Sequence, residues 1–246
     1  MDRLDLSIDS GTIFGLLGAN GAGKSTTIKM LTTLLPASSG SAEVAGFDVS
    51  RDPGRVRRMI GYVPQLVSAD GALTGTENMS LSASLYDIPR RTRAARIKEA
   101  LSFMGLADAA ELLVRTYSGG MVRRLEIAQA LMHQPVVLFL DEPTIGLDPI
   151  ARRAVWERLL ESRRQFETTI LITTHDMEEA DALCDVLAIM HKGRIAAQGS
   201  PAELKQRTGD DATLDDVFVK FAGSAIADDG SFRDINQTRR TASRLG

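Results

Sequence analysis

Residues 13–26 read IFGLLGANGAGKST, an apolar run followed by a glycine-rich segment and the start of a helix-like run. Residues 18–25 fit the pattern G-x-x-x-x-G-K-[ST] at every fixed position. A strand, a glycine loop and a helix in this order wrap backbone N–H groups around a phosphate. The stretch therefore predicts a phosphate-binding loop, and a glycine-rich turn that fits the pattern by chance is the plain alternative.

Each residue type in this loop has a chemical reason to be there. The glycines let the backbone N–H groups point inward, and the start of the helix adds positive partial charge. Lys24 is expected to reach the β- and γ-phosphates of a nucleotide, Ser25 to offer its hydroxyl to Mg²⁺ and Thr26 to donate to a phosphate. The predicted nucleotide-binding residues of the loop are Gly18, Asn20, Gly21, Ala22, Gly23, Lys24, Ser25 and Thr26.

A second apolar run, VVLFLDE at 136–142, ends in two acidic residues. At the end of a buried strand, Asp141 is placed to bind Mg²⁺ directly or through water. Glu142 is free to orient or deprotonate an attacking water. Taken alone, the pair is equally well explained as a solvated strand end. In a chain that also has a phosphate-binding loop, the pair predicts a site for Mg²⁺ and for the attacking water.

Two polar residues end further strand-like runs, His175 after residues 168–174 and Gln65 after residues 59–64. His175 is predicted to hydrogen-bond the γ-phosphate, and the Gln65 amide oxygen to reach Mg²⁺ or the attacking water. Each alone is more simply a surface residue. In an α/β sheet, however, the carboxyl ends of several strands converge on one ligand. The predicted catalytic residues are thus Lys24, Gln65, Glu142 and His175, and the predicted metal ligands are Ser25, Gln65 and Asp141.

Strand-like and helical runs alternate along the chain, which predicts an α/β fold with a mostly parallel sheet. Residues 73–132 have helical periodicity and indicate an inserted helical lobe. Residues 185–190 and 194–199, joined by a turn, predict an antiparallel edge hairpin. Alternating apolar residues at 4–8 predict a hairpin with 12–17, and residues 41–49 a further strand.

The composition limits the class of protein. The chain has 246 residues, 43% hydrophobic and 25% charged, with a net charge of −3, so nothing favours a nucleic-acid partner. Its longest apolar run, at 136–140, is far too short to span a membrane. The single cysteine, Cys184, excludes an internal disulfide, fits a reducing cytoplasm and is expected to be a packing residue.

A third glycine segment, YSGGMVRR at 117–124, precedes the helix-like run LEIAQALM. Ser118, Gly119 and Gly120 predict a second helix start that can bind an anion. The plain alternative is a serine N-cap followed by two hinge glycines.

Taken in order, these segments and TIGLDP at 144–149 resemble the ATP-binding subunit of an ABC transporter, over roughly residues 2–220. The resemblance implies a P-loop NTPase fold, ATP and Mg²⁺ as ligands, and ATP hydrolysis. It also implies a head-to-tail dimer, either of this chain or with a paired ABC subunit, in which Ser118, Gly119 and Gly120 cover the γ-phosphate held by the partner. Asp148 resembles the family's loop that crosses to the opposite subunit, and the following Pro149 also suits an N-cap.

The resemblance further implies a separate membrane permease that docks near Gln65 and residues 66–79, on the cytoplasmic face of the cell membrane. YSGGM and TLDDVFVKFAG at 213–223 resemble the daunorubicin-resistance branch of drug exporters. The resemblance leaves the cargo open, because exporters of drugs, lipids and polysaccharides all use such subunits. Residues 1–220 are expected to form the ATPase domain and 221–246 a polar, flexible tail. The alternative functions are a non-transport ABC-type ATPase and a non-hydrolysing nucleotide-binding regulatory module. Glu142 argues against the second of these, because a module that does not hydrolyse ATP needs no base.

Family members usually carry an adenine-stacking aromatic ahead of the point where this resemblance begins. None of the three tyrosines, at 62, 86 and 117, has that position. A start upstream, a substitute residue and weakened nucleotide binding are the open alternatives.

Overall fold

The computed structural model of the protein describes residues 4–227. Its main sheet has six strands in the order β4-β5-β6-β1-β7-β8, and all neighbours run parallel except β7 and β8. The mostly parallel sheet and the antiparallel edge hairpin predicted from the sequence are confirmed. The strands are β1 (Ile13–Leu17), β4 (Ile60–Val63), β5 (Val137–Asp141), β6 (Thr169–Thr174), β7 (Val186–His191) and β8 (Arg194–Gly199).

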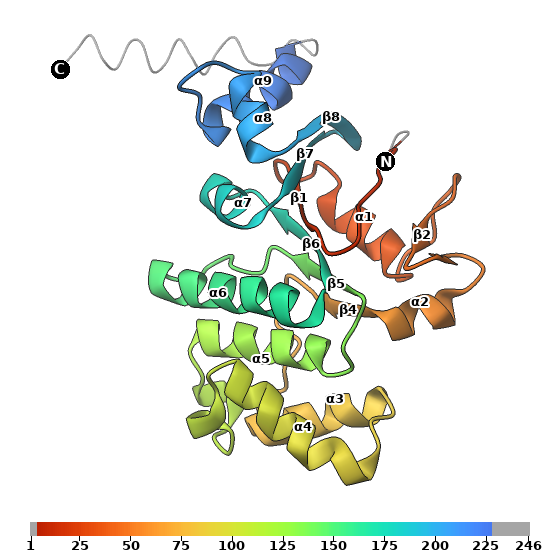
Figure 1. Ribbon diagram of the computed structural model, residues 1–246, viewed down its shortest axis with the longest axis vertical. Coiled ribbons are helices and arrows are strands. Elements are labelled where there is room, and N and C mark those ends of the chain that lie inside the picture. Colours follow the sequence, from red (N-terminus) through yellow and green to blue (C-terminus); the bar gives the residue numbers. More distant parts are fainter. Residues whose placement is uncertain (1–3, 228–246) are drawn as a thin grey trace, which may run out of the picture.

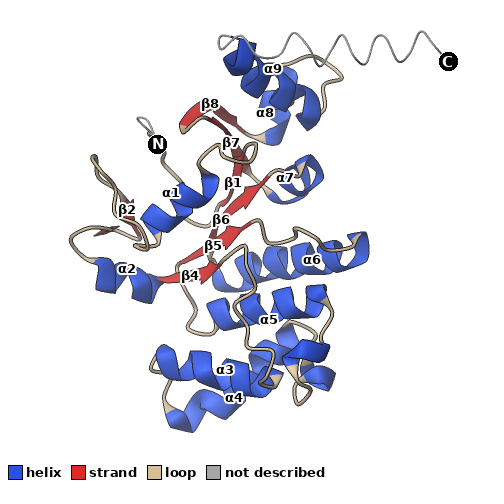
Figure 2. Cartoon of the chain, turned by 180° about the vertical axis from the view of Figure 1, so that it is seen from behind, coloured by secondary structure: helices blue, strands red, loops and turns tan. Residues whose placement is uncertain are grey.

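Helices cover both faces of this sheet. Figure 2 shows α1 (Lys24–Leu31) and α2 (Pro53–Met59) on one side, and α5 (Gly119–Leu131), α6 (Pro149–Phe166) and α7 (Met177–Leu183) on the other. Because side chains alternate along a strand, Phe14 and Leu16 pack in the core beside α1, whereas Ile13 and Leu17 pack in the core beside α6. Burial on both faces explains why the strands read as continuous apolar runs.

The inserted lobe consists of α3 (Gly75–Leu85), α4 (Arg90–Phe103), two short 3₁₀ turns (Ala107–Ala109 and Val114–Thr116) and α5. Thr74 and Glu77 form a reciprocal capping box that fixes the start of α3. Figure 1 shows α3 and α4 at one end of the molecule, while α8 (Pro201–Gln206) and α9 (Leu214–Ala227) lie at the other. Within the described residues, no helix is both long and apolar enough to cross a membrane.

The predicted hairpin at the start of the chain is not formed. Residues 4–9 have no strand structure, and Leu4, Leu6 and Ile8 instead pack, partly buried, against the core beside α1. Since β1 is bonded to β6 on one side and to β7 on the other, it has no free edge for a hairpin partner. The alternating apolar residues therefore indicate an extended segment that packs one side on the core, and not a β-strand.

Residues 41–49 also differ from the single strand predicted there. They form two short antiparallel strands, β2 (Glu43–Val44) and β3 (Phe47–Asp48). The two residues between them, Ala45 and Gly46, both have positive φ angles, of 52° and 80°. Two consecutive residues with positive φ make the tight turn whose twist matches that of a two-stranded hairpin.

Two further sequence predictions concern the C-terminal third. Helix α9 continues to Ala227, so the domain boundary predicted at residue 220 falls inside a helix, and Ala222 is buried. The rest of the predicted tail, residues 228–246, lies outside the described residues.

Cys184 is buried, and its burial raises the pKa of the thiol, as suits a packing residue.

Candidate functional site

The predicted phosphate loop connects β1 to α1. A Cβ atom on Gly18 would lie 2.6 Å from the carbonyl oxygen of Met190, so only glycine fits where the loop passes β7. The N–H of Gly193, in the turn between β7 and β8, donates to the Ala22 carbonyl at 2.8 Å. The edge hairpin therefore holds the loop from behind. Of the other predicted loop residues, Asn20, Gly21 and Thr26 are exposed, Ala22 is buried, and Gly23 and Ser25 are half-buried.

Lys24 is the first residue of α1 and is almost completely buried. Its ammonium group donates to the carbonyl oxygen of Gly18 at 2.7 Å. The same nitrogen lies 3.1 Å from Oε1 of Glu142, which is 5% exposed. The lysine of the loop is thus ion-paired with the carboxylate predicted to act on water.

Asp141 is the last residue of β5 and is 3% exposed. Its Oδ1 accepts a hydrogen bond from Ser25 Oγ at 3.0 Å and one from Thr173 Oγ1 at 2.6 Å. A carboxylate next to a hydroxyl is an oxygen donor pair of the kind that Mg²⁺ binds. Asp141 and Ser25 therefore fit the predicted metal ion.

Sequence reasoning did not single out Thr173. It is the residue paired with Asp141 in the parallel register of β5 and β6. Besides bonding Asp141, its hydroxyl accepts the backbone N–H of Glu142 at 3.0 Å. The one signal available in the sequence was its position two residues before His175, at the end of a buried strand.

Glu142 is the residue on which the other predicted catalytic side chains converge. It follows β5 in the left-handed region, with a φ of 49°, a strained conformation for a non-glycine residue. His175 Nδ1 lies 3.2 Å from its Oε2, and Gln65 Nε2 donates to the same oxygen at 3.4 Å. The Gln65 amide nitrogen, and not the oxygen expected to reach Mg²⁺ or water, thus faces the carboxylate.

Ser118, Gly119 and Gly120 begin helix α5, on the far side of the sheet from α1. Ser118 Oγ accepts a hydrogen bond from the N–H of Met121 at 3.3 Å, so the serine is the N-cap of α5. Ser118 and Gly119 are exposed, but Gly120 is buried. A Cβ on Gly120 would lie 2.7 Å from Cβ of Ala151, so this glycine lets α5 approach α6 closely.

Asp148 caps helix α6. Its Oδ1 accepts the N–H groups of Ile150 at 3.0 Å and Ala151 at 2.9 Å, and the residue itself is exposed. The neighbouring Leu147 would lie 3.4 Å from a Cβ on Gly119. The predicted N-cap is therefore present, and the two exposed segments around Ser118 and Asp148 lie side by side.

The loop between a central parallel strand and a helix, with an acidic strand end beside it, defines a P-loop nucleotide-binding fold. The family described as ABC transporter matches residues 1–145. The daunorubicin/doxorubicin resistance ATP-binding protein DrrA of Streptomyces peucetius is 46% identical over 209 residues, which are 85% of this chain and 63% of DrrA. The chain belongs to the ATP-binding proteins of the ABC transporter family, whose domains bind ATP.

Two further similarities agree with this assignment. The phospholipid-transporting ATPase ABCA3 of Homo sapiens is 45% identical over 87% of this chain, but this covers only 12% of the longer protein. A solved structure of the ATP-binding subunit of an ABC transporter has 30% sequence identity and a TM-score of 0.78, and the match covers 89% of this chain and 91% of that one. The chain thus spans nearly the whole of a solved ATP-binding subunit, and about 63% of DrrA.

Proposed function

We propose that this protein hydrolyses Mg-ATP as the ATP-binding subunit of an exporter-type ABC transporter. The observation that carries the proposal is the convergence of Lys24, Gln65 and His175 on Glu142, next to the pair formed by Asp141 and Ser25. A nucleotide-binding module that does not turn over has no need of a buried, strained carboxylate at this position.

The residues of this chain have separate tasks in the reaction. When ATP binds, the Lys24 ammonium exchanges Glu142 for the β- and γ-phosphates, which frees the carboxylate. Glu142 then orients the attacking water and accepts its proton. His175 and Gln65 hold Glu142 in place and reach toward the γ-phosphate. Ser25 and Asp141 would hold Mg²⁺, which would neutralise charge that develops on the phosphate oxygens.

The second half of the site comes from another subunit. Ser118 and Gly119 are exposed at the start of α5, where backbone N–H groups and the helix dipole favour an anion. In a head-to-tail dimer, of two copies or with a paired ABC subunit, they cover the γ-phosphate bound to the partner. The exposed Asp148 beside them faces the same interface.

A separate permease in the membrane is the second proposed partner. Leu66 and Val67 follow Gln65 directly and are 81% and 65% exposed, although both are large apolar residues. This pair suits the apolar face of a cytoplasmic helix of the permease, which would hold the protein at the inner face of the cell membrane. The name of DrrA supports export of a drug-like cargo. We draw the boundary of the ATPase domain after α9.

The first test is ATP-dependent dimerisation of Glu142→Gln, measured by the size of the purified protein with and without Mg-ATP. The substitution blocks water activation and leaves the loop intact, so the closed dimer accumulates and turnover is lost. Adding Ser118→Arg places a bulky cation against the partner's nucleotide and abolishes the dimer. An active wild type whose Glu142→Gln variant turns over equally fast would refute the assigned role of Glu142.

The permease partner is tested with Leu66→Ser together with Val67→Ser. We expect these changes to release the protein from membranes that contain the permease, at unchanged ATP binding. The matched control is Leu34→Ser with Leu35→Ser, a second pair of adjacent exposed apolar residues, which lies just after α1 (60% and 41% exposed). If both pairs release the protein equally, the docking site is not at Leu66 and Val67.

A further inference from the structure

Helix α5 carries a buried ion pair one turn after its exposed start. Arg123 Nη1 lies 3.0 Å from Glu126 Oε2, and the two side chains are 6% and 1% exposed. In the sequence, a basic and an acidic residue three positions apart on a helix are typical of a solvated face. The structure instead turns both residues inward, toward the segment that follows β4.

This pair binds both ends of residues 64–68. The Arg123 guanidinium donates to the carbonyl oxygen of Pro64 at 2.8 Å and to that of Gln65 at 3.1 Å. On the other side, Glu126 Oε1 accepts the backbone N–H of Ser68 and its hydroxyl, the latter at 2.9 Å. The backbone of Gln65 is therefore held by α5, while its side chain donates to Glu142.

Stability alone does not explain such a pair. Taking both charges out of water is costly, and burial lowers the pKa of Arg123 although Glu126 opposes the effect. An apolar pair of similar volume in such a place is often neutral or stabilising. What an apolar pair cannot supply is the set of hydrogen bonds to Pro64, Gln65 and Ser68. The specific contribution of the pair is thus the position of this segment.

We propose that Arg123 and Glu126 are positioning residues that tie helix α5 to Gln65, so that engagement of Ser118 with a partner's nucleotide fixes Gln65 against Glu142. The inference rests on the proposed ATPase function. It provides a physical route from one site of the dimer to the other. The start of α5 contacts the partner's phosphate, its second turn holds Gln65, and Gln65 contacts the carboxylate that acts on water in its own subunit.

The test is the double variant R123M/E126L in the full chain, which removes the charges but keeps apolar volume inside. We expect urea unfolding and the KM for ATP to stay close to those of the wild type. The kcat falls by roughly tenfold or more, because a small displacement of a group near the reacting atoms has a large effect on rate. Amide hydrogen exchange at Ser68, whose backbone N–H donates to Glu126, becomes faster than in the wild type, while exchange in β5 is unchanged.

The matched control is R158M/E161L, which removes another arginine and glutamate three positions apart, on α6, with side chains 34% and 43% exposed. Its kcat should equal that of the wild type. Arg123→Lys keeps the charge but cannot span two carbonyl groups and a carboxylate, so its kcat should lie between those of the wild type and the double variant.

The outcomes separate this inference from the proposed function. If the wild type binds Mg-ATP but does not hydrolyse it, alone or with its permease, the proposed function fails and the coupling role fails with it. If the wild type is active and R123M/E126L matches its kcat, the coupling role is refuted while the ATPase stands. A variant whose kcat falls only in proportion to its folded fraction also refutes the role, because the pair is then merely structural.

Discussion

The ammonium nitrogen of Lys24 lies 3.1 Å from Oε1 of Glu142, and both side chains are almost completely buried. One comes from the start of α1 and the other from the end of β5, so the contact joins the phosphate loop to the acidic strand end. In the proposed reaction Lys24 holds phosphates and Glu142 acts on water. Nucleotide binding must therefore break this ion pair. In the nucleotide-free protein, Lys24 and Glu142 neutralise each other's buried charge.

We expect a strong energetic coupling between these two residues in the nucleotide-free protein. Lys24→Met and Glu142→Gln should each lower the free energy of unfolding by about 2 kcal/mol or more, because each leaves a buried charge unpaired. The double variant should lose less than the sum of the two. Urea unfolding of the four proteins measures the cycle. Lys205 and Asp181, an ion pair with side chains 31% and 44% exposed, provide the comparison, with an expected coupling below about 1 kcal/mol. Equal coupling in both cycles would contradict this prediction.

The two glycines after Ser118 should respond differently to alanine. Gly120→Ala forces a methyl group to within 2.7 Å of Ala151 Cβ, so α5 and α6 must separate, at a cost of about 1–3 kcal/mol in unfolding free energy. Gly119→Ala meets only Leu147 Cδ2 at 3.4 Å, and its stability should stay close to that of the wild type. Because Gly119 is exposed where the partner's phosphate is expected, its variant should still lose nucleotide-dependent dimerisation. If Gly119→Ala dimerises normally, close approach of a phosphate at this residue is excluded.

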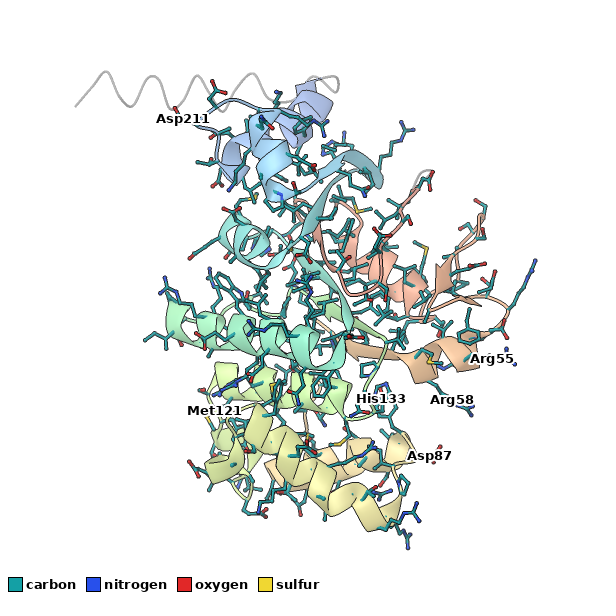
Figure 3. All side chains as sticks on the ribbon, viewed as in Figure 1. Arg55, Arg58, Asp87, Met121, His133 and Asp211 are labelled. Carbon is teal, nitrogen blue, oxygen red and sulfur yellow. The ribbon has the colours of Figure 1, made fainter. Side chains whose placement is uncertain are left out.

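His133 should make stability depend on pH. Figure 3 shows it at the end of α5 opposite Met121. Its Nε2 donates to the Ile60 carbonyl at 2.9 Å, its ring stacks on Tyr86, and its Nδ1 is buried with no partner among the described residues. Burial lowers the pKa of His133 from the ordinary 6.5. The unfolded chain therefore binds this proton more readily than the native state, and stability is lost as the pH falls from 6.5 toward the lowered pKa.

The measurement is the free energy of unfolding of the wild type and of His133→Gln between pH 5 and 8. Glutamine can still donate to Ile60 but does not titrate, so the difference between the two proteins should grow as the pH falls. A single group changes stability by at most about 1.4 kcal/mol per pH unit. Parallel curves for the two proteins would show that His133 takes up its proton equally in both states.

The phosphate loop could be predicted from the sequence because its chemistry is contiguous. Eight consecutive residues specify backbone shape, charge and hydroxyl, and an apolar run before them specifies a buried strand. The acidic strand end and the strand-end glutamine and histidine followed from one topological rule, that parallel strands deliver their carboxyl ends to one edge. The meeting of these side chains can therefore be predicted without knowing the order of the strands in the sheet.

The features that sequence reasoning missed depend on register and on which edges are free. Thr173 differs from its neighbouring threonines only because the register of β5 and β6 places it beside Asp141. The predicted N-terminal hairpin failed because both edges of β1 are occupied, which alternation along one segment cannot reveal. Arg123 and Glu126 give no signal in the sequence, because an arginine and a glutamate three positions apart are usual on exposed helices. The role of the pair becomes visible only in the structure, where residues 64–68 pass beside α5 and are hydrogen-bonded to both side chains.

The central place of β1 has a consequence for the way the chain is made. In the register of the sheet, Ile13 pairs with Ile170 on one side and Phe14 with Val186 on the other. Both partner strands are synthesised more than a hundred residues after β1. Until then IFGLL is an unpaired apolar segment, exposed to aggregation and to chaperones. The phosphate loop cannot be held between strand and hairpin until β7 and β8 have been synthesised, so competence to bind nucleotide arises only after the hairpin is made.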